Sequence, residues 1–165
     1  SDIGGGTTEI AVMSLGGVVY SNSLRVAGDA MDGAFANYMR KEYNLMIGDS
    51  TAEKIKKEIG TAIATNNNTY AVKGRDLRSG TPKEVGITEE DSVEALNPIL
   101  REMINGIKDA LENTPPELSA DLVDMGLTLT GGGALLKNID KRLSKETGLP
   151  VHIAVSYTHL RAHET

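Results

Sequence analysis

The chain has 165 residues, a formal net charge of −6 and no cysteine. The acidic balance argues against nucleic acid as a partner, and the lack of thiols excludes disulfides and cysteine-bound metals. The sequence contains no run of about 20 apolar residues, the length that a membrane-spanning helix requires. A chain of this length suits one domain or two small lobes.

Strand and helix patterns alternate in the first half of the chain. Gly16 and Gly17 separate two stretches of β-forming residues, which predicts a hairpin. Ser50 and Glu53 have the spacing of a capping box, in which each side chain bonds the other residue's backbone N–H. In chain order, we predict strands at 9–14 and 17–27, a helix from Gly28, a loop at 44–49, and a helix from Ser50 to about Ile59.

The second half begins with another predicted hairpin and then contains a long amphipathic helix. Pro98 lies within that helix, which therefore either kinks there or restarts with Asn97 as its cap. The predicted elements are strands at 69–75 and 82–88, a helix from Thr88, a helical turn at 117–121, a strand at 126–130, a helix after Gly133 that ends at Gly148, and a strand at 151–155. This mixture predicts an α/β or α+β fold.

Two glycine runs are the most informative motifs, because each adjoins a predicted strand. Residues 2–8 read DIGGGTT, and residues 127–136 read LTLTGGGALL. Glycine lets a ligand approach the backbone, so that successive N–H groups can cradle a phosphate. Thr7 and Thr8 add hydroxyl donors, and Asp2 offers a hard oxygen for Mg²⁺ or its water shell. We interpret the runs as two sides of one nucleotide cleft; a plain glycine-rich turn is the alternative reading of the first.

Neither run fits the two commonest nucleotide motifs. The sequence contains no G-x-x-x-x-G-K-[ST], and no G-x-G-x-x-G follows a predicted strand. The first run leads into a strand. The second stands between a strand and a helix N-terminus, a junction that favours anions and also lets a flat ring lie against bare backbone.

The first run resembles the second phosphate motif of the actin, heat-shock-chaperone and sugar-kinase superfamily, and the second run resembles its adenosine motif. Three longer stretches, DIGGGTTEIAVMSLGGVVYSNSLRVAGDAMDGAF, STAEKIKKEIG and TPPELSADLVDMGLTLTGGGALLKNIDKRLSKETGLPVHIA, together resemble the MreB family of bacterial actins. The resemblance covers residues 2–154. It implies an α/β, actin-like (ribonuclease-H-like) ATPase lobe with a small inserted α+β subdomain.

The resemblance also assigns site residues. Asp2 would act on the metal through water, while the main catalytic carboxylate lies in a half that this chain lacks. Glu53 and Lys56, with Lys54 and Lys57 as neighbours, would contact the ribose and adenine; helix capping by Glu53 and a merely solvated Lys56 are the alternatives. The residues that would hold the β- and γ-phosphates are Gly4, Gly5, Gly6 and Thr7. The residues of the adenosine loop would be Gly131, Gly132, Gly133, Ala134 and Leu135.

The family resemblance implies a slow, Mg²⁺-dependent ATPase with ATP and Mg²⁺ as cofactors. Such a protein would polymerise into filaments in the cytoplasm, at the inner face of the cell membrane, and direct cell-wall elongation and rod shape. Its partners would be further copies of itself, the elongation machinery and a membrane adaptor. Two alternatives share the fold: a small-molecule kinase, for which the sequence offers no sugar-binding residues, and a non-polymerising ATP-binding module.

The chain begins within a motif, so we expect it to be the second half of a longer protein. Alone it should hydrolyse ATP poorly, because phosphoryl transfer needs groups on both sides of the γ-phosphate. We predict an ATPase lobe at 1–49 and 91–154 and an inserted subdomain at 50–90, in which residues 75–80 are a candidate filament contact. Residues 155–165 depart from the family, and we expect a disordered or foreign tail rather than a metal site at its two histidines.

Overall fold

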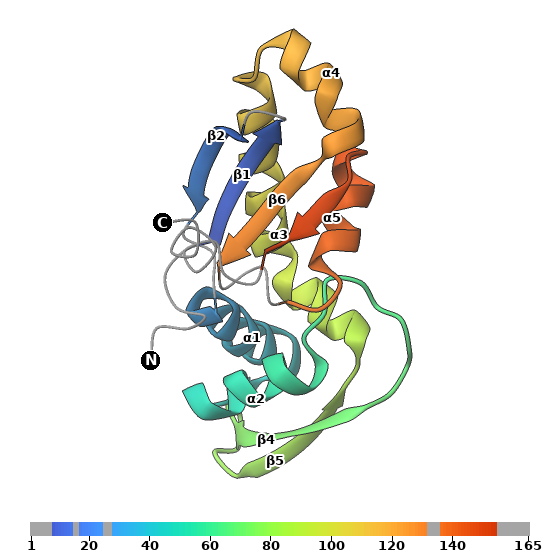
Figure 1. Ribbon diagram of the computed structural model, residues 1–165. Helices are drawn as coiled ribbons and strands as arrows, with labels where there is room; N and C mark the ends of the chain where they lie inside the picture. Colours follow the sequence, from blue (N-terminus) through green and yellow to red (C-terminus); the bar gives the residue numbers. More distant parts are fainter. Residues whose placement is uncertain (1–7, 15–16, 25–27, 132–135, 155–165) are drawn as a thin grey trace.

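The structure is a computed structural model and describes residues 8–14, 17–24, 28–131 and 136–154. Two sheets lie towards opposite ends of an elongated molecule, and helices cover them (Figure 1). The elements are β1 (Thr8–Ser14), β2 (Gly17–Leu24), α1 (Gly28–Tyr43), β3 (Leu45–Met46), α2 (Asp49–Ile59), β4 (Tyr70–Asp76), β5 (Pro82–Ile87), α3 (Glu89–Glu112), α4 (Pro116–Met125), β6 (Leu127–Gly131), α5 (Ile139–Thr147) and β7 (Val151–Ile153). Among the described residues, no helix combines the length and apolar character needed to span a bilayer.

The larger sheet has the strand order β2-β1-β6-β7. β1 runs antiparallel to both β2 and β6, and β7 runs parallel to β6. α3 contacts β1 and β2, while α5 contacts β7 and α3, so the two helices lie side by side behind this sheet (Figure 1). The predicted strands and the hairpin at Gly16–Gly17 are therefore present, and this sheet organises the candidate site.

The smaller sheet has the order β3-β4-β5, with antiparallel pairing throughout. β4 and β5 form the second predicted hairpin, and α2 packs against β4 while α1 packs against α2. β3 was not predicted, because a strand of two residues carries no readable period. It belongs to the smaller sheet although its residues precede position 50, where we placed the start of the inserted subdomain.

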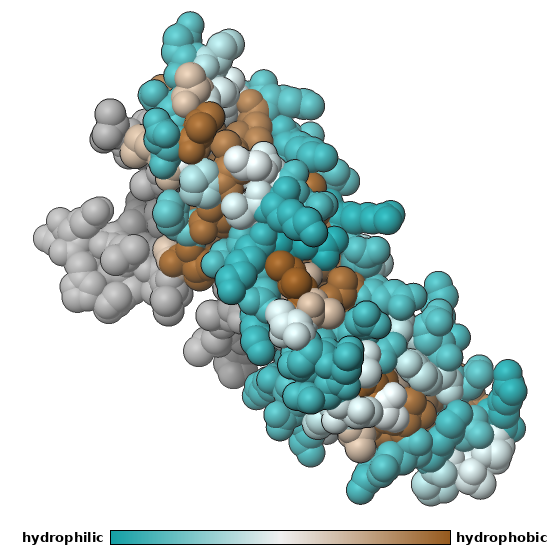
Figure 2. Space-filling view, turned by 90° about the vertical axis from the view of Figure 1, so that its right-hand side faces the viewer, coloured by the Kyte–Doolittle hydropathy of each residue, from teal (hydrophilic) through white to brown (hydrophobic). Residues whose placement is uncertain are grey.

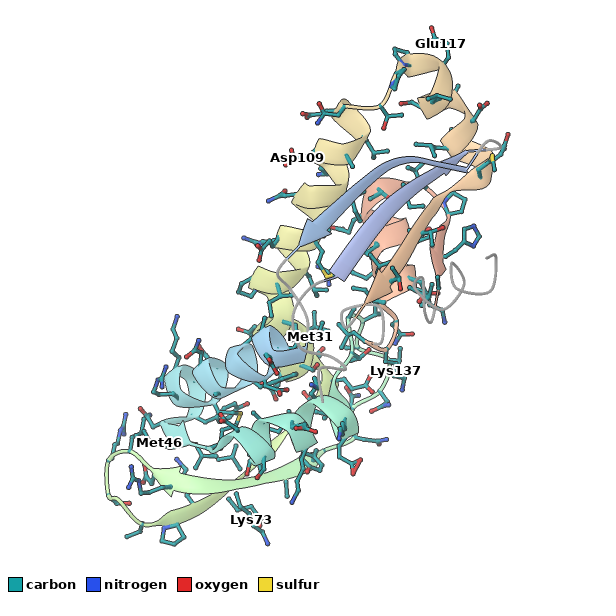
Figure 3. All side chains as sticks on the ribbon, turned by 60° about the vertical axis from the view of Figure 1, so that its left-hand side comes forward. Met31, Met46, Lys73, Asp109, Glu117 and Lys137 are labelled. Atoms are coloured by element: carbon teal, nitrogen blue, oxygen red, sulfur yellow. The ribbon has the colours of Figure 1, made fainter. Side chains whose placement is uncertain are left out.

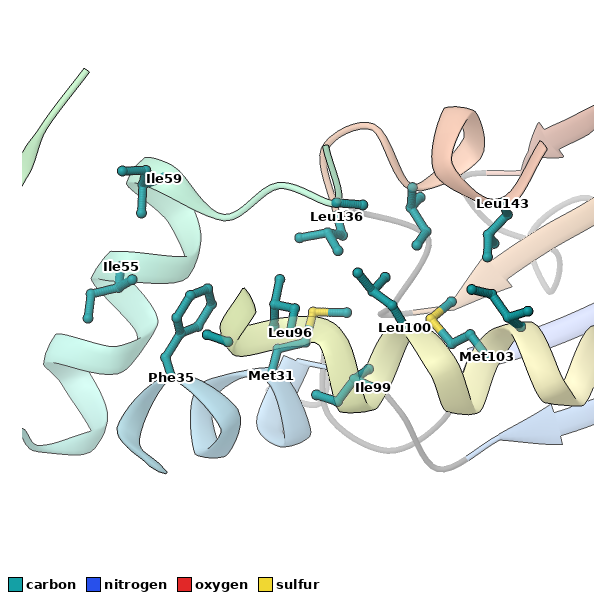
Figure 4. Close-up of a cluster of buried hydrophobic side chains, with 14 of the residues drawn as sticks. Met31, Phe35, Ile55, Ile59, Leu96, Ile99, Leu100, Met103, Leu136 and Leu143 are labelled. Carbon is teal, nitrogen blue, oxygen red and sulfur yellow. The ribbon is translucent and has the colours of Figure 1, made fainter. Parts of the chain in front are cut away.

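α3 connects the two parts of the molecule through a continuous apolar core (Figure 4). One end of α3 packs on α1 and α2, and the middle packs towards α5. Large side chains at these contacts are almost fully buried, and each contributes about 1.5–3 kcal/mol relative to exposure. They include Met31, Phe35, Ile55, Ile59, Leu96, Leu100, Met103 and Leu143.

Two local predictions require correction or refinement. The capping box at Ser50 and Glu53 is wrong: α2 begins at Asp49 with Gly48 as N-cap and makes no side-chain cap bond. Ser50 is thus already inside the helix, where its hydroxyl cannot cap. At Pro98, α3 continues rather than restarting. Pro98 is exposed on that helix, so its ring does not disturb the buried face.

The boundaries of two other helices also differ from the prediction. α4 extends over ten residues instead of a single turn. α5 begins at Ile139, so Leu136 lies before the helix although it is buried, and Asn138 at φ 65° marks the turn into α5. Gly148 ends α5 in the left-handed conformation, as predicted.

Candidate nucleotide-binding site

Three strands of the larger sheet end at the same place, next to the segments that carry the sequence motifs. We call this end of the sheet, at Thr8, Leu24 and Gly131, the glycine-bearing edge. Thr8, the first residue of β1, pairs with Gly131, the last residue of β6. Residues 2–7 lead into Thr8 and residues 132–135 follow Gly131, so the two glycine runs enter and leave the sheet at the same edge. Thr8 also pairs with Leu24, the last residue of β2, so the connection to α1 departs from this edge as well.

Lys56 of α2 lies beside the first turns of α1. Its Nζ atom is 3.1 Å from Oδ1 of Asp32 and 3.5 Å from the carbonyl oxygen of Gly28, the first residue of α1. Both side chains of the ion pair are about four-fifths buried. Since Gly28 is four residues beyond the end of β2, the Lys56 ammonium lies close to the chain that leaves the glycine-bearing edge.

The residues after α2 contact the segment that follows the second glycine run. Thr61 forms a parallel bridge with Lys137, and the Ala62 N–H donates to the Lys137 carbonyl at 2.9 Å. Asn138 Nδ2 donates to Thr61 Oγ1 at 3.0 Å. α2 therefore contacts the start of α1 through Lys56, and the residues that follow α2 contact residues 137 and 138, beyond the second glycine run.

Glu53 and Lys54 are exposed on α2. Glu53 pairs with Lys57 at 2.8 Å, and the hydrogen bond and positive charge of Lys57 lower the pKa of the Glu53 carboxyl. This pair is open to solvent, so the Glu53 carboxylate remains accessible to a ligand. Neither residue shares the fixed, buried setting of Lys56.

The remaining predicted site residues lie outside the described residues. They are Asp2, Gly4, Gly5, Gly6, Thr7, Gly132, Gly133, Ala134 and Leu135. Asp2 is the predicted metal residue, and the described part of the chain holds no cluster of three or more histidine or acidic side chains suited to a metal. The structure thus pairs the start of β1 with the end of β6 and places Lys56 against the start of α1, while the phosphate and adenosine contacts stay predictions.

Sequence reasoning missed two groups at this place. Asp32 lies in a predicted helix and Thr61 in a connection, and no local pattern distinguishes either residue. Their roles follow from contacts across 24 and 76 positions, which no local period encodes.

Two grooves among the described residues are formed elsewhere. One of about 690 Å³ lies between α1 and α3, with Ala34 and Pro98 on its walls. The other, of about 530 Å³, lies between α3, α5 and the 62–64 segment, and Figure 2 shows apolar side chains framed by polar ones on that side. Neither is lined by Glu53, Lys54 or Lys56, so neither is the predicted site.

The fold is actin-like. The crystal structure of MreB5 of Spiroplasma citri bound to AMPPNP matches with a TM-score of 0.82 and 43% identity over 92% of this chain and 46% of that chain. The same protein bound to ADP matches with a TM-score of 0.83 over 93% and 47%. The MamK double helical filament shares the fold, with a TM-score of 0.74. The match is 21% identical and covers 99% of this chain and 53% of that chain.

The chain belongs to the MreB/Mbl family, whose sequence model matches residues 1–162. It is 48% identical over 154 residues to the cell shape-determining protein MreB of Escherichia coli K12, covering 93% of this chain and 44% of that protein. It is 44% identical over 154 residues to the cell shape-determining protein Mbl of Bacillus subtilis, covering 93% and 46%. The chain therefore spans somewhat under half the length of these relatives.

Proposed function

We propose that this chain is the nucleotide-holding part of a polymerising bacterial actin that binds ATP and sets cell shape. The observation that carries the proposal is the pairing of Thr8 with Gly131, because these residues directly adjoin the two glycine runs in the sequence. The structural neighbour MreB5 has been solved with both AMPPNP and ADP, which supports nucleotide binding at the corresponding place.

The residues around that edge fit a nucleoside triphosphate. The Lys56 ammonium and the exposed Glu53 carboxylate offer a donor and an acceptor for ribose and base, and glycines let phosphates approach the backbone. ATP bound there would supply the energy of γ-phosphoryl transfer, with Mg²⁺ held through water at Asp2. This chain's own part is to hold and orient the nucleotide. Efficient hydrolysis requires the groups of the other half.

Polymerisation is supported by the charges at the two ends of the molecule (Figure 3). The basic end, residues 40–48 and 73–84, contains six basic and three acidic residues. The acidic end, residues 108–126, contains five acidic residues and one lysine. Figure 3 places Lys73 and Met46 at one extremity and Glu117 at the other.

Each end also exposes apolar side chains. Met46 and Leu77 at the basic end are 40% and 39% exposed, and Val123 at the acidic end is 63% exposed. Complementary ends of this kind favour a head-to-tail contact between copies, which is heterologous and open and so builds filaments. The hairpin residues 75–80 lie at the basic end, where we predicted a filament contact.

The further partners follow from the family. Relatives carry the name cell shape-determining protein, so we propose that the filaments act with the cell-wall elongation machinery and a membrane adaptor at the inner face of the cell membrane. The division into an ATPase lobe at 1–49 and 91–154 and an inserted subdomain at 50–90 is part of the same proposal.

Nucleotide binding is tested by titrating a fluorescent ATP analogue into the full-length protein that contains this chain. Replacing Lys56 by Met should weaken binding about tenfold, the usual effect of losing one charge-assisted hydrogen bond. Replacing the exposed Lys108 by Met, at the acidic end, is the matched control and should leave binding unchanged. Equal affinities for all three proteins would refute the placement of the nucleotide beside α2.

A further inference from the structure

Lys56 is held at two points, unlike the other lysines of its helix. Its Nζ atom lies 3.1 Å from Asp32 Oδ1 and 3.5 Å from the Gly28 carbonyl oxygen. The Asp32 and Lys56 side chains are 20% and 21% exposed. In the neighbouring pair, Lys57 is 69% exposed and free to move with solvent. The position of the Lys56 ammonium is therefore fixed by α1.

Asp32 sits in an unfavourable place for a carboxylate. Its Oδ1 atom is buried and makes no well-aligned hydrogen bond within the described part of the chain; Lys56 is the cation beside it. Burial raises the pKa of Asp32 against the opposing effect of Lys56, and the charges of Glu53 and Asp29 raise it further. A buried charge is costly even when it is paired, so this ion pair is a poor way to stabilise a helix contact.

The Asp32–Lys56 ion pair orients the donors of the Lys56 ammonium. A lysine ammonium carries three N–H donors; the Gly28 carbonyl oxygen accepts from it at 3.5 Å, and Asp32 Oδ1 holds it as a counter-ion at 3.1 Å. Among the described residues Nζ has no further partner, so a free N–H remains for a ligand. The place is the start of α1, four residues beyond Leu24 at the edge where both glycine runs meet the sheet.

We propose that Asp32 is a positioning residue: it holds the Lys56 ammonium against the first turn of α1 so that the free N–H donates to a ribose hydroxyl of the bound nucleotide. This inference rests on the proposed function, because it requires a nucleotide beside α2. It assigns to Asp32 a role that acts through Lys56 and involves no direct contact with the ligand.

The test compares two nucleotides in the full-length protein. Affinities are measured for ATP and for 2′,3′-dideoxy-ATP, which lacks both ribose hydroxyls, by competition with a fluorescent analogue. Asp32→Asn should weaken ATP binding about tenfold and dideoxy-ATP binding far less, because the lost donor served a hydroxyl. The preference for ATP over dideoxy-ATP should therefore fall about as much.

Three further variants separate positioning from a structural role. Asp32→Glu keeps the charge and should retain much of the preference. Asp29→Asn makes the same chemical change at an exposed position in the first turn of α1 and should retain all of it. In a Lys56→Met background, Asp32→Asn should cause no further loss.

The outcomes are distinct. Equal weakening of both nucleotides by Asp32→Asn, or a loss that persists without Lys56, would overturn the positioning role while leaving ATP binding intact. Failure of the unaltered protein to bind either nucleotide would refute the proposed function itself, and the positioning role with it. If Asp32→Asn does not fold, a normal preference in the folded Asp32→Ala or Asp32→Leu variant would equally contradict the inference.

Discussion

The contact between α1 and the start of α3 allows a quantitative prediction. The Tyr38 and Tyr43 hydroxyls both donate to Oδ1 of Asp91, the second at 2.8 Å, and the Thr88 N–H donates to Oδ2 of the same carboxylate at 2.9 Å. Asp91 thus caps α3 and ties α1 to it. The two tyrosine rings also pack edge to face, with centroids 6.1 Å apart.

Removing one of the two tyrosine hydroxyls should lower the free energy of unfolding by less than half as much as removing both. A hydrogen bond to a charged group contributes about 1.5–3 kcal/mol, and partial exposure reduces this to about 1 kcal/mol for Tyr43→Phe. Because both hydroxyls share one oxygen, the remaining bond strengthens when the other is lost. We therefore expect the double variant Tyr38→Phe, Tyr43→Phe to cost about 3 kcal/mol, more than the sum of the single changes.

The loss of stability in these tyrosine variants should also depend on pH. Burial raises the pKa of Asp91, but the hydrogen bonds from Tyr38, Thr88 and Tyr43 outweigh it and hold that pKa below 3.8. Burial and the Asp91 contact raise the pKa of Tyr43 to about 12, so its hydroxyl stays protonated at neutral pH. A depressed carboxyl pKa stabilises the fold above pH 3.8, and this stabilisation is lost as the pH falls through the lower, folded value.

Urea unfolding followed by circular dichroism measures these costs at pH 7 and at successively lower pH. The matched control is Tyr70→Phe, since the described residues offer the Tyr70 hydroxyl no hydrogen-bond partner. Strictly additive single changes, or a cost that stays constant as Asp91 is protonated, would refute the shared-acceptor explanation.

Three further predictions concern separate features. Gly126 has φ +79°, and a Cβ atom there would lie 2.3 Å from the Pro150 carbonyl oxygen, so Gly126→Ala should destabilise the fold by more than about 2 kcal/mol. Gly33 lies in open space on α1, so the control Gly33→Ala should stabilise the fold by up to about 1 kcal/mol. Equal melting temperatures for the two variants would contradict this prediction. Buried Glu89 accepts hydrogen bonds from the Thr65 N–H and hydroxyl and from Asn66 Nδ2. Because Glu89→Ala removes these bonds, it should hasten thermolysin cleavage within residues 60–69. An unchanged cleavage rate would argue against this role of Glu89. Reversing charge with Arg75→Glu and Arg78→Glu should abolish filament formation but spare ATP binding, whereas persisting filaments would remove the hairpin from the contact.

Elements with a long apolar period were predictable from the sequence. α3 and both hairpins follow directly from their side-chain patterns, and Gly148 ends α5 as its lack of a side chain predicts. The two-residue strand β3 is fixed only by pairing with Arg75 and Asp76, which lie 29 and 31 positions away. The capping prediction at Ser50 failed because Gly48 in extended conformation starts the helix earlier than the motif implies.

The sequence suggested which residue types the candidate site contains, and it gave no indication of how their elements are arranged. The glycine runs pointed to phosphate binding through their own chemistry, whereas the ribose role of Lys56 came only from the family resemblance. That arrangement depends on the register of β1 with β6, which pairs Thr8 with Gly131, 123 positions away, and on side chains that meet between α1 and α2. Asp32 shows most clearly what the sequence alone does not reveal. No feature of the local sequence distinguishes it from Asp29, three residues earlier, which is exposed.

The most direct test of the account is sedimentation of the full-length protein with ATP and Mg²⁺, with and without lipid vesicles, beside the same protein carrying Lys56→Met. We predict that the unaltered protein pellets as filaments only with nucleotide, and that the variant requires about tenfold more ATP. Pelleting that is independent of nucleotide would contradict the role of the glycine-bearing edge. A protein that binds ATP and stays monomeric would contradict polymerisation and favour the kinase or the non-polymerising ATP-binding module.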